Sequence, residues 1–130
     1  MSAWRWIGIA TVLAINDEQL AEHGGASGVR DRGLLESAMA RPINLAAYGR
    51  PDAPALAAAY AFGIVRNHPF VDGNKRTAFT TAATFLLDNG HELNASERDA
   101  ALTTLQLADG TLDEEAFAAW LRANCVPFEE

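Results

Sequence analysis

The sequence predicts an all-α fold, a compact single-domain bundle of about six helices. Apolar residues recur at three- and four-residue spacing along most of the chain, which is the period of amphipathic helices. Capping residues, glycines and prolines separate these periodic segments. Because 130 residues can bury a core of their own, we expect residues 1–130 to form one domain.

Helix-capping and helix-ending residues set the expected bounds of the helices. Before the first helix, the apolar segment Trp4–Ile9 is expected to pack the amino terminus onto the body. The first three helices are expected from a cap at Thr11 to about His23, from a cap at Asp31 to Arg41 with Pro42 ending it, and from a cap at Asp52 through Ala53–Asn67. The last three are expected from Asn74 to about Asn89 with Gly90 as the stop, after Ser96 with Asp99 three residues on, and after the capping box of Thr111 and Glu114.

The composition of two segments predicts where they lie in the fold. The helix at Ala53–Asn67 is rich in alanine, and small side chains let neighbouring helices approach closely, so we expect it to be the buried central helix. The stretch Pro42–Asp52 contains two prolines and a glycine and is expected to be a loop.

The composition is that of an ordinary globular protein with an acidic balance. Hydrophobic residues make up 49% and charged residues 21%, and the formal net charge is −7 at pH 7. This charge argues against a general binder of nucleic acid or of anionic membranes. The single cysteine, Cys125, rules out a disulfide within the chain, and no apolar run is long enough to cross a bilayer. We therefore expect a cytoplasmic protein.

Most of the side chains suited to chemistry lie between Arg66 and Phe79, where one predicted helix ends and the next begins at about Asn74. A helix start offers free backbone N–H groups and the positive end of the helix dipole, which together suit a phosphate. Cations in a first helical turn cost about 0.3–1 kcal/mol each, so a basic pair there is understandable if an anion is bound. The candidate groups are a base (His68), a carboxylate (Asp72), a glycine (Gly73), an amide (Asn74) and three cations (Arg66, Lys75, Arg76).

The run from His68 to Asn74, followed by Lys75-Arg76-Thr77, resembles the signature of the Fic/Doc family, and most closely its Doc (death-on-curing) branch of toxin–antitoxin systems. The resemblance covers roughly residues 10–120. The other stretches that resemble this branch are His23-Gly24-Gly25, Arg32 to Ala38, Arg41-Pro42 and Asn89-Gly90.

The resemblance implies roles for the candidate residues. His68 would deprotonate the acceptor hydroxyl, a contribution of about 10²–10⁴ in rate. Asp72 would help to hold Mg²⁺ on the phosphates of ATP. We expect Lys75 and Arg76 to assist catalysis by neutralising charge. The residues expected to bind the nucleotide phosphates are Arg66, Gly73, Asn74, Lys75 and Arg76. Phe70 is expected to anchor the loop in the core, and Pro69 to hold His68 in an extended backbone.

The resemblance also leaves alternatives for the activity. A kinase toxin would move the γ-phosphate of ATP to a threonine of elongation factor Tu, whereas most Fic proteins transfer AMP. A third alternative is a non-catalytic module that works with an antitoxin as a co-repressor. The motif departs from the usual Fic pattern at Lys75, in place of a glycine, and at Phe79, in place of an arginine, and both departures favour the kinase.

Two further expectations follow from the same family. A separate antitoxin would restrain the protein by laying a helical tail in a groove. No direct contact with nucleic acid or membrane is expected. In Fic-like proteins a flap precedes the motif helices and holds the target peptide, and Pro42–Tyr48 is the matching position here, with a plain loop as the alternative.

Overall fold

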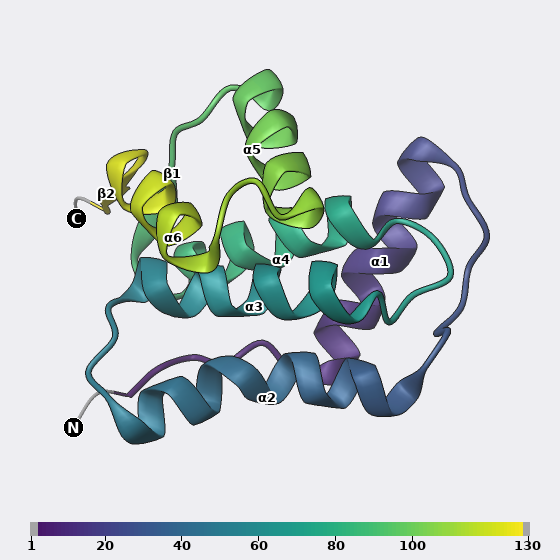
Figure 1. Ribbon diagram of the computed structural model, residues 1–130, viewed down its shortest axis with the longest axis horizontal. Helices are drawn as coiled ribbons and strands as arrows, with labels where there is room; N and C mark the ends of the chain where they lie inside the picture. The colour runs from purple at the N-terminus through teal and green to yellow at the C-terminus, as the bar shows by residue number, and fades with distance from the viewer. Residues whose placement is uncertain (1–2, 129–130) are drawn as a thin grey trace.

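The structure is a computed structural model that describes residues 3–128, and within them the chain is all-α, as predicted. These residues form six helices and two short strands, and the two strands pair as one antiparallel sheet (Figure 1). The elements are α1 (Ile9–His23), α2 (Arg32–Tyr48), α3 (Ala53–Asn67), α4 (Asn74–Asp88), β1 (His91–Leu93), α5 (Glu97–Asp109), α6 (Glu114–Ala123) and β2 (Cys125–Pro127).

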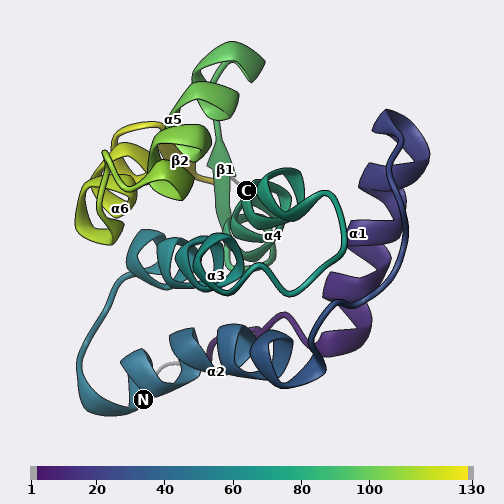
Figure 2. The ribbon, with the colours of Figure 1, turned by 45° about the vertical axis from the view of Figure 1, so that its right-hand side comes forward.

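Helix α3 is the central helix, as its alanine content predicts. It packs against α2, α4, α5 and α6, while α1 crosses the far side of α4 (Figures 1 and 2). Its residues from Ala57 to Ala61 are all buried. At Gly63 the absence of a side chain permits a close approach of α2, because a Cβ there would lie 3.1 Å from both Cα and the carbonyl oxygen of Ala38.

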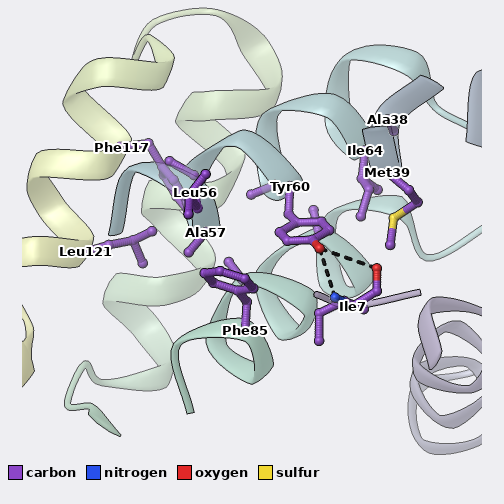
Figure 3. Close-up of a cluster of buried hydrophobic side chains, with 14 of the residues drawn as sticks. Ile7, Ala38, Met39, Leu56, Ala57, Tyr60, Ile64, Phe85, Phe117 and Leu121 are labelled. Carbon is purple, nitrogen blue, oxygen red and sulfur yellow. Dashed lines mark hydrogen bonds between the residues drawn. The ribbon is translucent and has the colours of Figure 1, made fainter. Parts of the chain in front are cut away.

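The segment before α1 packs onto this core, as expected. The hydroxyl of Tyr60, which is fully buried on α3, accepts a hydrogen bond from the Ile7 N–H at 2.8 Å and donates to the Ile7 carbonyl at 3.3 Å (Figure 3). Burial raises the pKa of Tyr60 to about 12. Trp4 and Trp6 lie against the ring of Phe85 on α4, with centroids about 6 Å apart. These contacts tie the amino-terminal segment to both α3 and α4.

Three predicted helix starts are confirmed by their caps. The Asp31 carboxylate accepts from the N–H of Leu34, Asp52 accepts from Ala55, and the Ser96 hydroxyl accepts from Asp99. Helix α4 begins at Asn74, as predicted, and the positive φ of Gly90 follows its end. The helices next to the candidate motif, α3 and α4, therefore have the predicted bounds.

Two other predicted caps are wrong. Helix α1 begins at Ile9 after Gly8, so Thr11 lies inside it and caps nothing. Helix α6 begins two residues later than predicted, because Asp113 accepts from the Ala116 N–H at 2.8 Å and so acts as the cap. Thr111 instead donates to the Asp109 carboxylate at 2.7 Å in the preceding turn.

The prediction that Pro42 ends the second helix is also wrong, and so is the flap expected at Pro42–Tyr48. Of the loop expected at Pro42–Asp52, only residues 49–52 lie outside a helix. Helix α2 continues through Pro42 to Tyr48. Pro42 lacks the N–H that would bond to the carbonyl of Ala38, but it is buried on the same stripe as Leu35, Ala38 and Met39. The packing of this stripe on α3 outweighs the lost hydrogen bond.

Candidate active site

The candidate site is the loop of residues 68–73, which connects the end of α3 to the start of α4 beside α1 (Figures 1 and 2). Phe70 is fully buried and anchors the loop in the core, as predicted. The backbone of His68 is left-handed, with φ 51° and ψ 54°, and not extended as Pro69 predicts. This conformation lets the His68 N–H close the last turn of α3 on the Ile64 carbonyl at 3.0 Å.

Arg30 and its neighbours hold this loop from the segment before α2. The Arg30 guanidinium donates to the carbonyl oxygens of His68 at 2.7 Å and Asn67 at 2.9 Å, and so caps the end of α3. Its backbone N–H donates to the Pro69 carbonyl at 2.7 Å. The Val71 N–H donates to the Gly28 carbonyl at 3.0 Å, which completes a short antiparallel pairing of the two segments.

Asn74 organises the interior of the loop. Its side chain is buried, and its Oδ1 accepts from the Phe70 N–H at 3.0 Å while its Nδ2 donates to the Phe70 carbonyl at 2.9 Å. The same Nδ2 lies 3.3 Å from Nδ1 of His68. The predicted contact of the Asn74 amide with phosphate stays a prediction, and it would have to replace one of these bonds.

The Asn74 contact also assigns a tautomer to His68. Since the two bonds to Phe70 fix the orientation of the amide, its NH₂ group faces the ring and can only donate. We therefore assign the lone pair of the neutral His68 ring to Nδ1 and its proton to Nε2. The side chain is exposed, so Nε2 is accessible to a ligand.

Asp72 is exposed, and the loop that follows α1 holds one of its carboxylate oxygens. The Ala26 N–H donates to Oδ2 at 2.7 Å, which leaves Oδ1 for another partner. No group of three or more His, Cys, Asp or Glu side chains in residues 3–128 could hold a metal ion by itself. A single exposed carboxylate fits Mg²⁺ that takes its other ligands from phosphates and water.

The start of α4 is open to an anion. Gly73, with φ 78°, precedes the helix, and no side chain caps its first N–H groups. Lys75 and Arg76 are exposed in the first turn, and no acidic partner within residues 3–128 forms an ion pair with either. Two unpaired cations beside free N–H groups form an electropositive site.

Within residues 3–128, the contacts of Arg66 are with other parts of the structure than this group. Its guanidinium lies 5.7 Å from the ring centre of Phe62 on α3. Together with Phe62 it lines a cleft of about 340 Å³ against the turn between α5 and α6. The predicted contact of Arg66 with phosphate stays untested.

Three residues that contact the loop were not predicted from the sequence: Asn16, Ala26 and Arg30. Asn16 is buried on α1 and bonds to the backbone of Asp72. The only signal for it in the sequence is its spacing, four residues from both Val12 and Leu20, which places a polar residue on an apolar face of the helix. Ala26 and Arg30 lie in a glycine-containing loop and carry no local signal, since their partners lie 46 and 38 residues away along the chain.

Comparison with known proteins defines the class to which this fold and loop belong. The family model described as "Fic/DOC family" matches residues 6–86, which is more than half of the chain. The protein is therefore a member of the Fic/DOC family.

Two relatives lie on the Doc side of this family. The chain is 33% identical to "Protein kinase doc" of Escherichia phage P1 over 119 residues, which cover 91% of this chain and 94% of that protein. It is 51% identical to "Toxin Doc" of Mycolicibacterium smegmatis (strain ATCC 700084 / mc(2)155) over 75 residues, which cover 55% of this chain and 57% of that protein.

Proposed function

We propose that this protein is the toxin of a type II toxin–antitoxin system and a protein kinase that transfers the γ-phosphate of ATP to a protein hydroxyl. The observation that carries the proposal is the open start of α4, where exposed His68 and Asp72 lie in one loop beside Lys75 and Arg76, which form no ion pair within residues 3–128. The names of the two relatives, a toxin and a protein kinase, support it. By resemblance to the Doc branch, the acceptor is a threonine of a translation factor such as elongation factor Tu.

In this proposal, His68, Asp72 and the first residues of α4 each have a part in one transfer step. The acceptor oxygen bonds to the γ-phosphorus, the bond to the bridging oxygen breaks, and ADP leaves. His68 takes the proton of the acceptor hydroxyl. In the assigned tautomer Nε2 already carries a proton. To accept the acceptor's proton there, the ring must first carry its own proton on Nδ1, which breaks the contact with the Asn74 amide. The N–H groups after Gly73, with Lys75 and Arg76, bind phosphate oxygens.

Asp72 is the residue that would hold Mg²⁺, through the carboxylate oxygen that Ala26 leaves free. When bound, the ion supplies positive charge that neutralises the phosphates. Arg66 is proposed to bind phosphate as well, although its contacts in this structure are with Phe62 and the neighbouring cleft.

Transfer of AMP is the second candidate, and Phe79 favours the kinase over it. In the usual Fic motif an arginine at this position can clamp the outer phosphates of ATP. Here the Phe79 ring packs on Trp120 of α6, with centroids 6.4 Å apart, so this position provides no cation to the phosphates. Lys75 also fills space that a glycine would leave open to the phosphates. Both features disfavour the orientation that AMP transfer needs.

We also propose an antitoxin as the partner and the cytoplasm as the site of action. The described residues include no helix with the length and apolarity to cross a bilayer. A purely non-catalytic co-repressor would not need the exposed His68 and Asp72 in one loop with a basic helix start, so an enzyme is favoured.

The proposal is tested with ATP labelled at either the α or the γ position, incubated with the purified protein, Mg²⁺ and elongation factor Tu. We expect label from the γ position on a threonine of the factor. His68→Ala should abolish transfer. His91→Ala is the matched control, because His91 lies in β1 at the opposite end of α4, and it should leave transfer unchanged.

Each outcome separates the alternatives. Transfer from the α position and not the γ position would establish AMP transfer and refute the kinase. Transfer of neither label by the folded protein, to elongation factor Tu or to any protein of a cell extract, would refute both enzymatic functions. Transfer to another protein of the extract would refute only the named target.

A further inference from the structure

We propose that Asn16 on α1 is a positioning residue for Asp72. Its side chain holds the Asp72–Gly73 turn in place, so that the Asp72 carboxylate is presented at the start of α4. The part of this inference that concerns metal-bound nucleotide rests on the proposed function. The part that concerns the position of Asp72 does not.

The bonds of Asn16 connect α1 to both sides of the turn. Its Nδ2 donates to the backbone carbonyl of Asp72 at 3.1 Å and to the hydroxyl of Thr77 at 3.1 Å. The Asp72 carbonyl only accepts, so the orientation of the amide is determined. Asn16 is 2% exposed and Thr77 is fully buried. One buried NH₂ group therefore fixes the loop and the first turn of α4 to the same point on α1.

Close packing around the turn restricts it further. A Cβ added to Gly73 would lie 3.3 Å from Nδ2 of Asn16 and 3.3 Å from Cδ2 of Leu20. A Cβ added to Gly25 would lie 2.8 Å from the same Leu20 atom and 3.2 Å from Cβ of Asp72. Helix α1 thus lies directly under the turn, and the loop after α1 closes over its other side.

The side chain of Asp72 is then fixed at a second point. Its backbone carbonyl is held by Asn16, and its Oδ2 is held by the Ala26 N–H at 2.7 Å. With both ends of the residue held, Oδ1 is the atom left to bind a ligand. Loss of the Asn16 bond would free the backbone end, and the Ala26 N–H alone would then hold the residue.

A merely structural role for Asn16 would predict a different result. Its loss would then weaken the whole domain, whatever residue stands at position 72. A positioning role predicts that the effect on nucleotide binding depends on the Asp72 carboxylate. Partners that orient metal ligands typically change metal affinity by about 10–100-fold.

The first experiment measures binding of ATP, with and without Mg²⁺, by calorimetry. The proteins are wild type, Asn16→Ala, Asp72→Asn and the double variant. We expect Asn16→Ala to weaken Mg²⁺-dependent binding about tenfold in the wild-type background and to have no further effect beside Asp72→Asn. Thr77→Val is the matched control. It removes one bond of Asn16, keeps the bond to Asp72, and should change affinity by less than about threefold.

The second experiment needs no ligand. The Ala26 amide reports the position of the Asp72 carboxylate, because it donates to that group. In Asn16→Ala its proton resonance should lose the shift caused by this hydrogen bond, whereas Thr77→Val should retain it. The Val71 amide, bonded to the Gly28 carbonyl, serves as the internal reference. If Asn16→Ala does not fold, Asn16→Leu removes the same donors with little change in volume.

The outcomes distinguish the inference from the proposed function. An unchanged Ala26 resonance in the folded variant, or an equal loss of affinity with and without the Asp72 carboxylate, would overturn the role of Asn16. If wild type binds no Mg²⁺–ATP, the proposed function fails, and the Ala26 resonance alone decides whether Asn16 positions Asp72.

Discussion

Asn74→Ala should be among the most destabilising single substitutions in the loop. It removes the partners of the Phe70 N–H and of the Phe70 carbonyl, and Phe70 is fully buried. Each buried backbone group left unsatisfied costs about 1–3 kcal/mol. Because exposed His68 lies beside the amide, water can replace part of these bonds, and we expect a loss of about 3 kcal/mol in the free energy of unfolding.

The assay is urea unfolding together with thermal unfolding. For a domain of this size a loss of about 3 kcal/mol lowers Tm by about 10 °C. Asn44→Ala makes the same chemical change at an exposed position of α2, and should stay within about 0.5 kcal/mol of wild type. An Asn74→Ala protein as stable as Asn44→Ala would show that the loop does not depend on this amide.

The same variant tests the tautomer assigned to His68. In wild type, ¹⁵N spectra of the neutral ring should show the proton on Nε2, because the Asn74 amide donates to Nδ1. In a folded Asn74→Ala protein the two tautomers should approach the mixture found in free histidine. A wild-type ring with its proton on Nδ1 would contradict the assignment, whatever the stability result.

Two further predictions concern the frame around the site. Gly63→Ala should cost about 1–3 kcal/mol, because its Cβ would lie 3.1 Å from backbone atoms of Ala38, whereas Gly33→Ala, which has a more open surrounding, should be neutral or stabilising in the same unfolding assay. The Arg122 guanidinium beside Asp52 holds the pKa of that carboxyl below its ordinary value. The stability that the Asp52–Arg122 ion pair adds to the folded protein is therefore present above about pH 4. It is lost as the pH falls through the folded-state pKa of Asp52. Both side chains are half exposed, so Asp52→Asn should cost less than about 1 kcal/mol near pH 7. This cost should shrink as the pH falls below about 4, and a cost that does not change with pH would exclude the ion pair as the cause.

The starts of α3 and α5 and the end of α4 were predictable because their signals are local. Asp52 and Ser96 each bond to an N–H three residues away, and Gly90 follows the end of α4 directly. Such contacts depend only on neighbouring residues. Local signals also explain why Thr111 was assigned wrongly. Thr111 and Asp113 both offer a capping oxygen, and the local sequence does not decide between them.

The continuation of α2 through Pro42 depended on distant packing. Pro42 is a strong local signal for a helix end, yet it occupies the buried stripe formed with Leu35, Ala38 and Met39. The stripe has the spacing of an amphipathic helix, so the sequence held two conflicting signals. The contact with α3 decided between them, and this contact is not encoded near Pro42.

The candidate site combines both kinds of information. The loop residues themselves form one short motif and could be identified from the sequence, but the conformation of His68 could not. A non-glycine residue with positive φ before a proline costs about 1–3 kcal/mol and persists only where its surroundings hold it. Here Arg30 holds the carbonyl of His68 and Asn74 holds its ring, while Asn16 fixes the other end of the loop. Because Arg30 and Asn16 come from segments far away in the sequence, the geometry of the site exists only when α1, the segment before α2, and α4 are packed together.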